Sequence, residues 1–172
     1  MSESRIINIL FVDAGNSARS ILAEALLNRL GAGRFEAFSA GFDPAPAISP
    51  YVLGLLHTMR YNTGWLATKP VDAMIGRYIP PFDAIVRLSP GLPPGGRWPP
   101  CRHGAVIVDW CLEDPRERFD SKAMIAQGYA AIMEVLIGRL ETVTRLAPEA
   151  FRDPDIVLRL DQLAMPHRRM TG

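Results

Sequence analysis

Apolar and polar residues follow one another along this chain in blocks that predict strands and helices in alternation. The run from Arg5 to Val12 is almost continuously apolar, which is typical of a parallel strand covered on both faces. The next segment repeats apolar side chains at helical spacing and stops at Gly31. Further strands are predicted over 34–40, 84–88 and 105–110, and helices over 18–30, 50–61, 70–77 and 121–146.

This alternation predicts the fold class. Strands alternating with helices imply βαβ units, and right-handed crossovers place helices on both faces of a parallel sheet. We therefore expect a three-layer, doubly wound α/β fold with a four-stranded parallel sheet. The proline- and glycine-rich stretch 89–100 is predicted to be a loop. The length of 172 residues, about half of them apolar, favours a single core.

The short polar stretch between the first strand and the first helix is the strongest candidate for a binding site. It reads Asp13-Ala-Gly-Asn-Ser-Ala-Arg19-Ser20, and open parallel sheets bind ligands beyond the carboxyl ends of their strands. Gly15 and Asn16 tolerate positive φ, so successive amides can form an anion-binding nest at a helix N-terminus. The planar guanidinium of Arg19 matches the oxygens of phosphate, sulfate or arsenate. The candidate oxyanion-binding residues are Ala14, Gly15, Asn16, Ser17, Ala18 and Arg19.

Charge and composition argue against several classes of function. Nineteen basic and eighteen acidic residues give no electrostatic case for binding nucleic acid or an anionic membrane. No uninterrupted apolar run approaches the ~20 residues of a membrane span, and the first residues lack a signal-peptide pattern, so we expect a cytoplasmic protein. Cys101 and Cys111 are too few for a disulfide framework and lack a metal-ligand spacing, so neither a metal nor a cofactor is expected.

The stretch from Asp13 to Ser20 resembles the phosphate loop of the low-molecular-weight protein tyrosine phosphatases and the thioredoxin-coupled arsenate reductases. The pattern of that family is a cysteine, five residues, an arginine and a serine or threonine. The spacing fits, but Asp13 stands at the position of the nucleophilic cysteine, and Ala18 stands where many members have a second cysteine. The resemblance continues through Ser39-Ala40-Gly41, which is similar to the family's second strand, and covers roughly residues 5–146.

The resemblance also implies roles for the catalytic positions Asp13, Arg19, Ser20 and Asp114. Asp114-Pro115 is similar to the segment that carries the family's general acid, which implies that Asp114 protonates the leaving-group oxygen. The alternative is a simple turn, because an aspartate before proline favours turn geometry. Ser20 is interpreted as a first-turn hydroxyl that bonds the loop backbone and would stabilise an anion at position 13.

Four further residues are predicted to support the loop from below. Asn16, Glu24 and Ser39 fall where arsenate reductases of this group have a potassium site. Lys69 takes the position of that site's remaining carboxylate, so its ammonium group would occupy the place of the cation. The alternative is that Lys69 is a solvated loop lysine, as its compact charge and flexible stem allow.

The aspartate at position 13 changes the chemistry that the loop supports. The loop amides and Arg19 favour an ionised carboxylate, but it is far less nucleophilic than a thiolate and repels a bound oxyanion. The sequence has no cluster of carboxylates beside it that would hold a divalent cation and offset this repulsion. Arsenate reduction needs electrons from thiols, and Ser89 stands where the relay cysteine pair of the arsenate reductases begins.

Two hypotheses follow from different classes of function. The favoured one is a catalytically degenerate phosphatase-like protein that binds an oxyanion or a phosphorylated partner, or that fills the anion site with Asp13 and serves as an interaction module. The alternative is a phosphoester hydrolase in which Asp13 acts as nucleophile or general base and Asp114 as general acid.

Residues 147–172 extend beyond the usual family length and are predicted to follow the domain of residues 1–146 as a C-terminal extension. Ile156, Leu160 and Leu163 would share one side of a short amphipathic helix. That helix would pack on its own domain or form a docking surface, which allows a homodimer. The basic run His167-Arg168-Arg169 is predicted to be a frayed tail.

Overall fold

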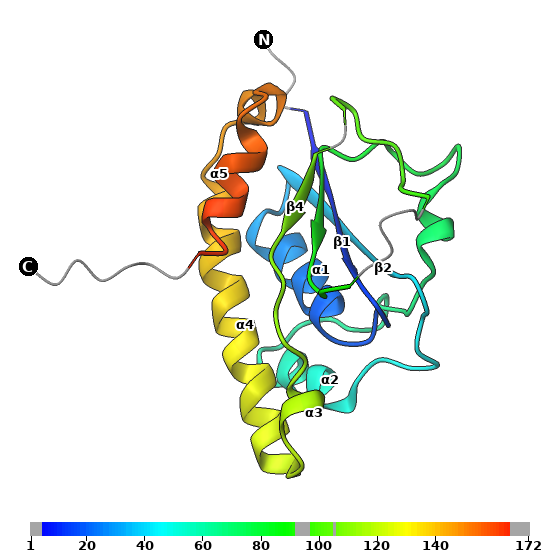
Figure 1. The fold of residues 1–172 in the computed structure, drawn as a ribbon, viewed down its shortest axis with the longest axis vertical. Helices are drawn as coiled ribbons and strands as arrows, with labels where there is room; N and C mark the ends of the chain where they lie inside the picture. The colour runs from blue at the N-terminus through cyan, green and yellow to red at the C-terminus, as the bar shows by residue number, and fades with distance from the viewer. Residues whose placement is uncertain (1–4, 92–96, 105, 166–172) are drawn as a thin grey trace, which may run out of the picture.

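The computed structural model describes residues 5–91, 97–104 and 106–165 (Figure 1). Four parallel strands form one sheet in the order β2-β1-β3-β4. The strands are β1 (Ile7–Asp13), β2 (Phe35–Gly41), β3 (Ala84–Arg87) and β4 (Ile107–Asp109). The helices are α1 (Arg19–Leu30), α2 (Pro50–Thr58), α3 (Pro115–Arg118), α4 (Lys122–Thr144) and α5 (Ile156–Gln162), with 3-10 helices η1 (Val71–Met74) and η2 (Pro148–Arg152). The predicted four-stranded parallel α/β fold is confirmed.

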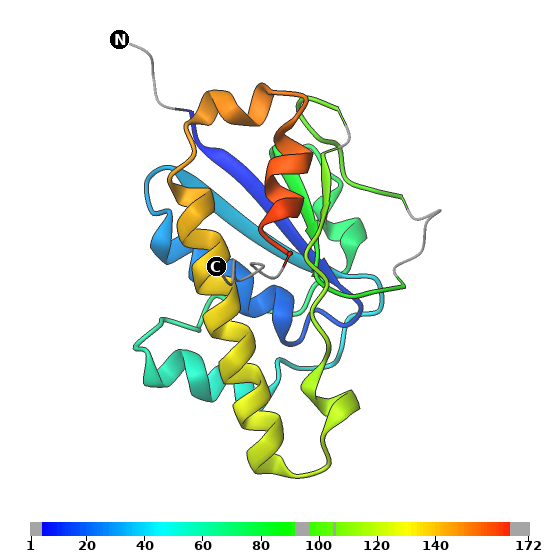
Figure 2. The same cartoon turned by 60° about the vertical axis from the view of Figure 1, so that its left-hand side comes forward.

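One face of the sheet is covered by the long helices. Ile9 and Phe11 of β1 pack in a core with Leu26 of α1 and with Leu136 and Leu140 of α4, all of them buried. Figure 2 shows α4 crossing in front of α1, and helices α2 and α5 add side chains to the same core. The helical periodicity of α1 and α4 therefore faces the sheet as predicted.

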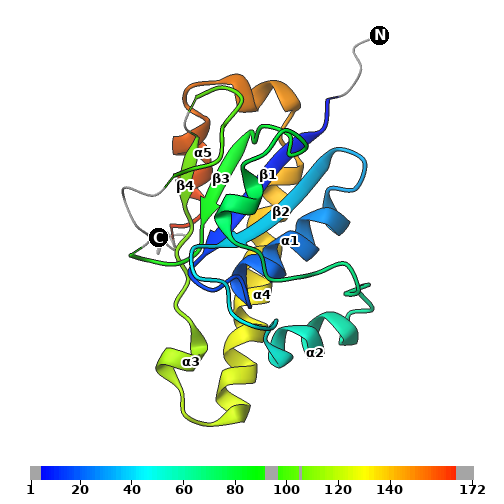
Figure 3. The ribbon, with the colours of Figure 1, turned by 90° about the vertical axis from the view of Figure 1, so that its right-hand side faces the viewer.

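The other face of the sheet has a lighter cover. Leu10 and Ile85 pack there against Val71 and Met74 of η1, the short green helix in front of the sheet in Figure 3. The helix predicted over 70–77 is only the 3-10 turn η1, because Pro70 precedes it and Gly76 follows soon after. The predicted strand 105–110 is likewise shorter, since β4 contains three residues and residue 105 lies outside the described part.

The topology places the polar stretch 14–18 at the centre of the sheet. β1 lies between β2 and β3, and the chain runs from β1 through α1 to one side and later returns to the other. The strand order reverses there, and in open α/β sheets this is the position where ligands bind beyond the strand ends. Motif and topology therefore select the same site.

Helix α4 is long and apolar on average, although polar residues interrupt its apolar ones. Its length and its mean hydropathy of 1.3 over an 18-residue window are sufficient for a membrane-crossing helix. Core helices of soluble proteins meet the same criterion, and one stripe of α4 packs on the sheet. The buried side chains of that stripe are Tyr129, Ile132, Met133, Leu136, Leu140 and Val143.

The described part of the C-terminal extension packs on the same chain. Phe151 of η2 and Ile156 and Leu160 of α5 are buried in the core beneath α1 and α4. The Trp110 indole donates to the Leu160 carbonyl at 2.8 Å, and the Asp161 carboxylate accepts the Asp109 amide of β4 at 2.9 Å. The extension therefore covers an edge strand, while the predicted basic tail at 167–169 lies outside the described residues.

Candidate functional site

The loop between β1 and α1 is fixed by backbone hydrogen bonds and by a left-handed residue. Asn16 has φ 46°, one of two non-glycine residues with positive φ among those described. The Ala14 and Gly15 carbonyls accept the amides of Asp43 and Ala45 at 2.9 and 2.8 Å. A side chain at Gly41 would place its Cβ 2.8 Å from both Ala14 O and Asn16 N, so only glycine fits beside the loop.

The Asp13 carboxylate is folded back into its own loop. It is buried, and its two oxygens accept the amides of Asn16 at 2.5 Å and Ser20 at 2.9 Å. The anion from β1 thus satisfies one N–H group of the loop and one in the first turn of α1. Among the described residues, the amides of Gly15, Ser17, Ala18 and Arg19 donate no hydrogen bond.

The guanidinium group of Arg19 is held at one side of the loop. Its Nη1 donates to the Leu112 carbonyl at 2.5 Å, and its Nη2 lies 3.5 Å from an Asp114 oxygen. Its Nε is buried and has no partner among the described residues. The Nε–H group of Arg19 is therefore a buried donor without a partner in the described part of the chain.

Asp114 is an anchored carboxylate at the start of α3. It caps that helix by accepting the Arg116 amide at 3.0 Å, and it also accepts the Arg116 side chain at 2.8 Å and the Tyr129 hydroxyl at 2.8 Å. Burial alone would raise the pKa of Asp114, but these hydrogen bonds outweigh burial and lower the pKa to about 2. Burial and the Asp114 carboxylate raise the pKa of Tyr129, which keeps its proton.

The loop between β1 and α1 and the segment around Asp114 together line a small cavity of about 220 Å³, called the cup below. Its lining residues are Asp13, Ala14, Gly15, Ser17, Ala18, Arg19, Asp43, Asp114, Arg116 and Glu117. Four carboxylates and two guanidinium groups therefore surround this space. Asp43 and Glu117 form no ion pair among the described residues, so the rim is more acidic than an anion site requires.

The four predicted support residues lie together beneath the loop. The Asn16 side-chain amide donates to the Ser20 and Ser39 hydroxyls, both at 2.9 Å, while its oxygen accepts the Lys69 amide at 2.7 Å. Ser39 donates to Glu24, and the Lys69 ammonium lies 3.5 Å from the same carboxylate. Burial raises the pKa of Glu24, and Lys69 opposes that shift. The Lys69 ammonium thus lies beside the Glu24 carboxylate, and its role as a substitute for a cation stays a prediction.

The residues considered for thiol chemistry do not assemble a relay. The Ser89 hydroxyl accepts the Ala14 amide at 3.1 Å, so it holds the loop that a relay cysteine would serve. The backbone of Cys101 forms an isolated β-bridge with Phe82, which precedes β3, so Cys101 lies at the end of the sheet opposite the loop. Burial raises the pKa of both Cys101 and Cys111, which favours their protonated forms.

Sequence reasoning missed several residues of the site. Arg116 lies two positions after Asp114, where the backbone amide commonly bonds the side chain of a helix cap. Its contact with Asp114 could therefore have been predicted from the sequence. Tyr129, the Leu112 carbonyl and Asp43 reach the site only through tertiary packing. No group of three or more His, Cys, Asp or Glu that could hold a metal occurs in the described ranges.

Comparison with known proteins agrees with this geometry. The profile of the low molecular weight phosphotyrosine protein phosphatases matches residues 8–90, whereas no curated protein matches the chain. The thioredoxin-dependent arsenate reductase Cg_ArsC1' of Corynebacterium glutamicum is 27% identical with a TM-score of 0.59, over 82% of this chain. The present chain covers only 61% of that protein.

Two further solved structures share the fold. An arsenate reductase from Archaeoglobus fulgidus is 23% identical with a TM-score of 0.60, over 79% of this chain and 98% of its own. An arsenate reductase described in the phosphate binding state is 20% identical with a TM-score of 0.60, over 80% of this chain and 98% of its own. The matched profile, the shared fold and the loop at the end of β1 make the chain similar to the low molecular weight phosphotyrosine protein phosphatases and to solved arsenate reductases.

Proposed function

We propose that this chain is a catalytically degenerate member of the family, in which Asp13 acts as an internal anion and the protein works by binding. The observation that carries the proposal is the pair of hydrogen bonds from the Asn16 and Ser20 amides to the Asp13 carboxylate. They hold the carboxylate at the helix N-terminus, where a thiolate nucleophile would need to face the substrate. The predicted cytoplasmic location remains a prediction.

Two residues support a loss of phosphatase turnover, one at the position of the nucleophile and one at the position of the general acid. Asp13 is a planar, weakly nucleophilic anion, and an incoming phosphate would meet its negative charge at short range. Asp114, the expected acid, has a pKa of about 2 and is an ionised acceptor near neutral pH. An ionised Asp114 has no proton to give to a leaving oxygen.

Loss of arsenate reduction is supported by the positions of the thiols. The loop contains no cysteine, and Cys101 lies at the opposite end of the sheet. Reduction of arsenate requires two electrons, which a relay of thiols would have to deliver to the bound oxyanion. The chain offers no cysteine pair beside the cup among the described residues.

Weak binding of an oxyanion is the remaining activity of the loop. The unengaged amides of Gly15, Ser17 and Ala18 and the free Nε of Arg19 suit phosphate, sulfate, arsenate or a phosphorylated partner. A solved arsenate reductase with this fold has been captured in a phosphate binding state. We expect Asp13 to keep the affinity low, because its charge opposes a second anion in the same cup.

Substitutions at Asp13 test this proposal directly. Inorganic phosphate is titrated into the wild type, Asp13→Asn and Asp13→Cys, with binding followed by calorimetry. We expect Asp13→Asn to bind phosphate at least about tenfold more tightly than the wild type, because one charge repulsion is removed. Asp72→Asn, an exposed change on η1 away from the cup, is the control and should bind as the wild type does.

The same proteins are assayed with p-nitrophenyl phosphate. Asp13→Cys should gain measurable turnover, because a thiolate regains the loop amides and Arg19. The wild type should show none with magnesium or manganese and should trap no acyl phosphate. Metal-dependent turnover by the wild type, with an acyl phosphate on Asp13, would instead establish the alternative in which Asp13 is a nucleophile.

A further inference from the structure

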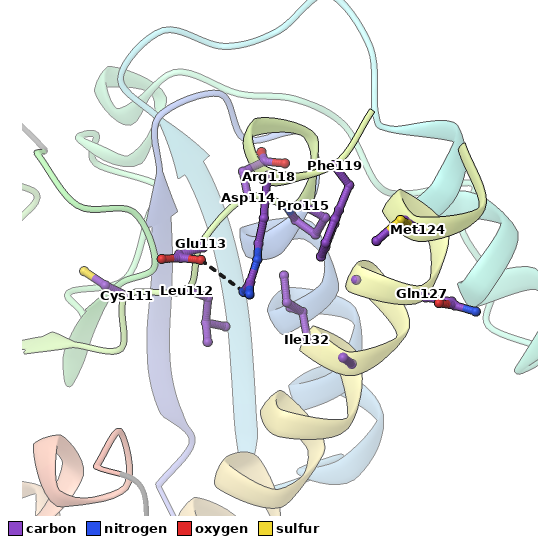
Figure 4. A pocket seen from close by; sticks show the side chains of 12 residues that line it. Cys111, Leu112, Glu113, Asp114, Pro115, Arg118, Phe119, Met124, Gln127 and Ile132 are labelled. Atoms are coloured by element: carbon purple, nitrogen blue, oxygen red, sulfur yellow. Dashed lines mark ion pairs between the residues drawn. The ribbon is translucent and has the colours of Figure 1, made fainter. Parts of the chain in front are cut away.

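Helix α4 borders one hollow in each of its halves, and the two hollows together are called the α4 groove. Its N-terminal half borders a hollow of about 480 Å³ against α3, and its C-terminal half borders one of about 560 Å³ against the end of α5. Figure 4 shows the first hollow, with Met124, Gln127 and Ile132 of α4 on one side and Leu112 on the other. Both hollows are lined by side chains of α4.

The floor of this groove is an apolar seam with coiled-coil spacing. Met124, Ala131, Val135, Gly138 and Thr142 follow one another at intervals that place them on one helical stripe. The Met124 and Val135 side chains are 47% and 42% exposed. This stripe lies outside the stripe that α4 buries against the sheet, so α4 presents a second apolar face to solvent.

Of the two glycines of α4, Gly128 serves packing within the chain, whereas Gly138 leaves room for a close neighbour on the seam. A Cβ at Gly128 would lie 2.6 Å from Pro115, so packing within the chain requires that glycine. A Cβ at Gly138 would meet nothing within 4 Å, although glycine inside a helix lowers its stability. Nothing in the described part of the chain requires a small residue at 138, whereas a helix laid along the seam would approach closely there.

One rim of the groove is acidic. Gln127, Glu134 and Glu141 are exposed and spaced seven residues apart on α4, parallel to the seam. Neither Glu134 nor Glu141 forms an ion pair with any described residue. The neighbouring Arg139 is directed inward, where it donates to the Trp110 and Ala164 carbonyls. The two carboxylates therefore remain available to a partner.

We propose that this groove binds a basic amphipathic helix of another protein. The apolar stripe of that helix would lie on the seam, and its lysine or arginine residues, at heptad spacing, would pair with Glu134 and Glu141. Antiparallel pairing of α4 with a second copy centred on this seam would bring the two Glu134 side chains together, and an anionic membrane would face the same carboxylates. Charge therefore favours the basic helix over both.

The test uses two synthetic amphipathic helices of equal length, one of leucine and lysine and one of leucine and glutamate. Each carries a fluorophore, and anisotropy is measured with the full chain. The wild type should bind the lysine peptide saturably and the glutamate peptide at least roughly tenfold more weakly. The double variant E134K/E141K should reverse that preference, while the control Glu36→Lys on β2 should leave it unchanged.

Three results would overturn the proposal. These are no saturable binding of the lysine peptide, a preference that does not reverse in the swapped variant, and a dimer in light scattering that E134K/E141K leaves intact. Tight binding to phosphatidylglycerol vesicles without peptide binding would assign the face to a membrane instead. The outcome is independent of the cup, since phosphate titration of the wild type reports on the proposed function separately.

Discussion

The support residues beneath the loop 14–18 and the carboxylates at its rim differ in whether their charges are paired. Beneath the loop, the Glu24 carboxylate is matched by the Lys69 ammonium and the Ser39 hydroxyl, and Asn16 uses both ends of its amide. Above it, Asp43 and Glu117 form no ion pair among the described residues.

The difference teaches that charges beneath the loop are paired with one another, whereas carboxylates at its rim are left without an ion-pair partner among the described residues. Ser39 and Lys69 bond the left-handed Asn16 directly, and Glu24 contacts both of them. At the rim, the Asp13 carboxylate accepts a loop amide, and hydrogen bonds hold the pKa of Asp114 at about 2. Whether these residues serve as a binding site stays a prediction.

The largest effect is expected from breaking the underside. Lys69→Met leaves the Glu24 carboxylate, whose side chain is only 6% exposed, without its cation. We expect a loss of about 2 kcal/mol in the free energy of unfolding, measured by urea denaturation, because an unpaired buried charge is costly. Lys122→Met removes an exposed lysine at the start of α4 and is the matched control. Equal losses in the two variants would assign Lys69 no special part in the loop.

An acid titration examines the rim. The pKa of folded Asp114 lies below the ordinary value of 3.8, at about 2, so its contribution to stability is complete above the ordinary pKa and is lost as pH falls towards 2. The free energy of unfolding is measured for the wild type and for Asp114→Asn from neutral pH to about pH 2.5. The difference between the two proteins should shrink by up to about 2 kcal/mol over this range. A difference that does not vary with pH would mean that Asp114 is not held as an anion.

Smaller losses of stability are expected when either hydrogen-bond partner of the Asp114 carboxylate, Tyr129 or Arg116, is replaced. Tyr129→Phe removes one buried hydrogen bond to Asp114 and should cost about 1 kcal/mol of unfolding free energy. Arg116→Gln removes a half-exposed ion pair and should cost less, about 0.5 kcal/mol, because solvent screens it. The reverse ranking, measured by thermal unfolding at neutral pH, would show that Arg116 is the main anchor.

Much of the fold was readable because its signals are local. The continuous apolar run of β1 and the 3.6-residue periodicity of α1 and α4 specify their structure within a few turns of chain. Elements without such a signal were misjudged: the helix predicted over 70–77 is one 3-10 turn, and α3 was not predicted. Short segments take their conformation from caps and neighbours, which apolar spacing does not reveal.

The sequence by itself determined where the candidate site is, since the strand-loop-helix pattern and the spacing from Asp13 to Arg19 are local features of the chain. The tertiary structure decided which charged groups of the site pair with one another. Lys69 meets Glu24 across 45 positions, and Tyr129 meets Asp114 only because α4 packs beside α3. A charged side chain takes its protonation state and its role from the groups around it, and folding brings those groups together.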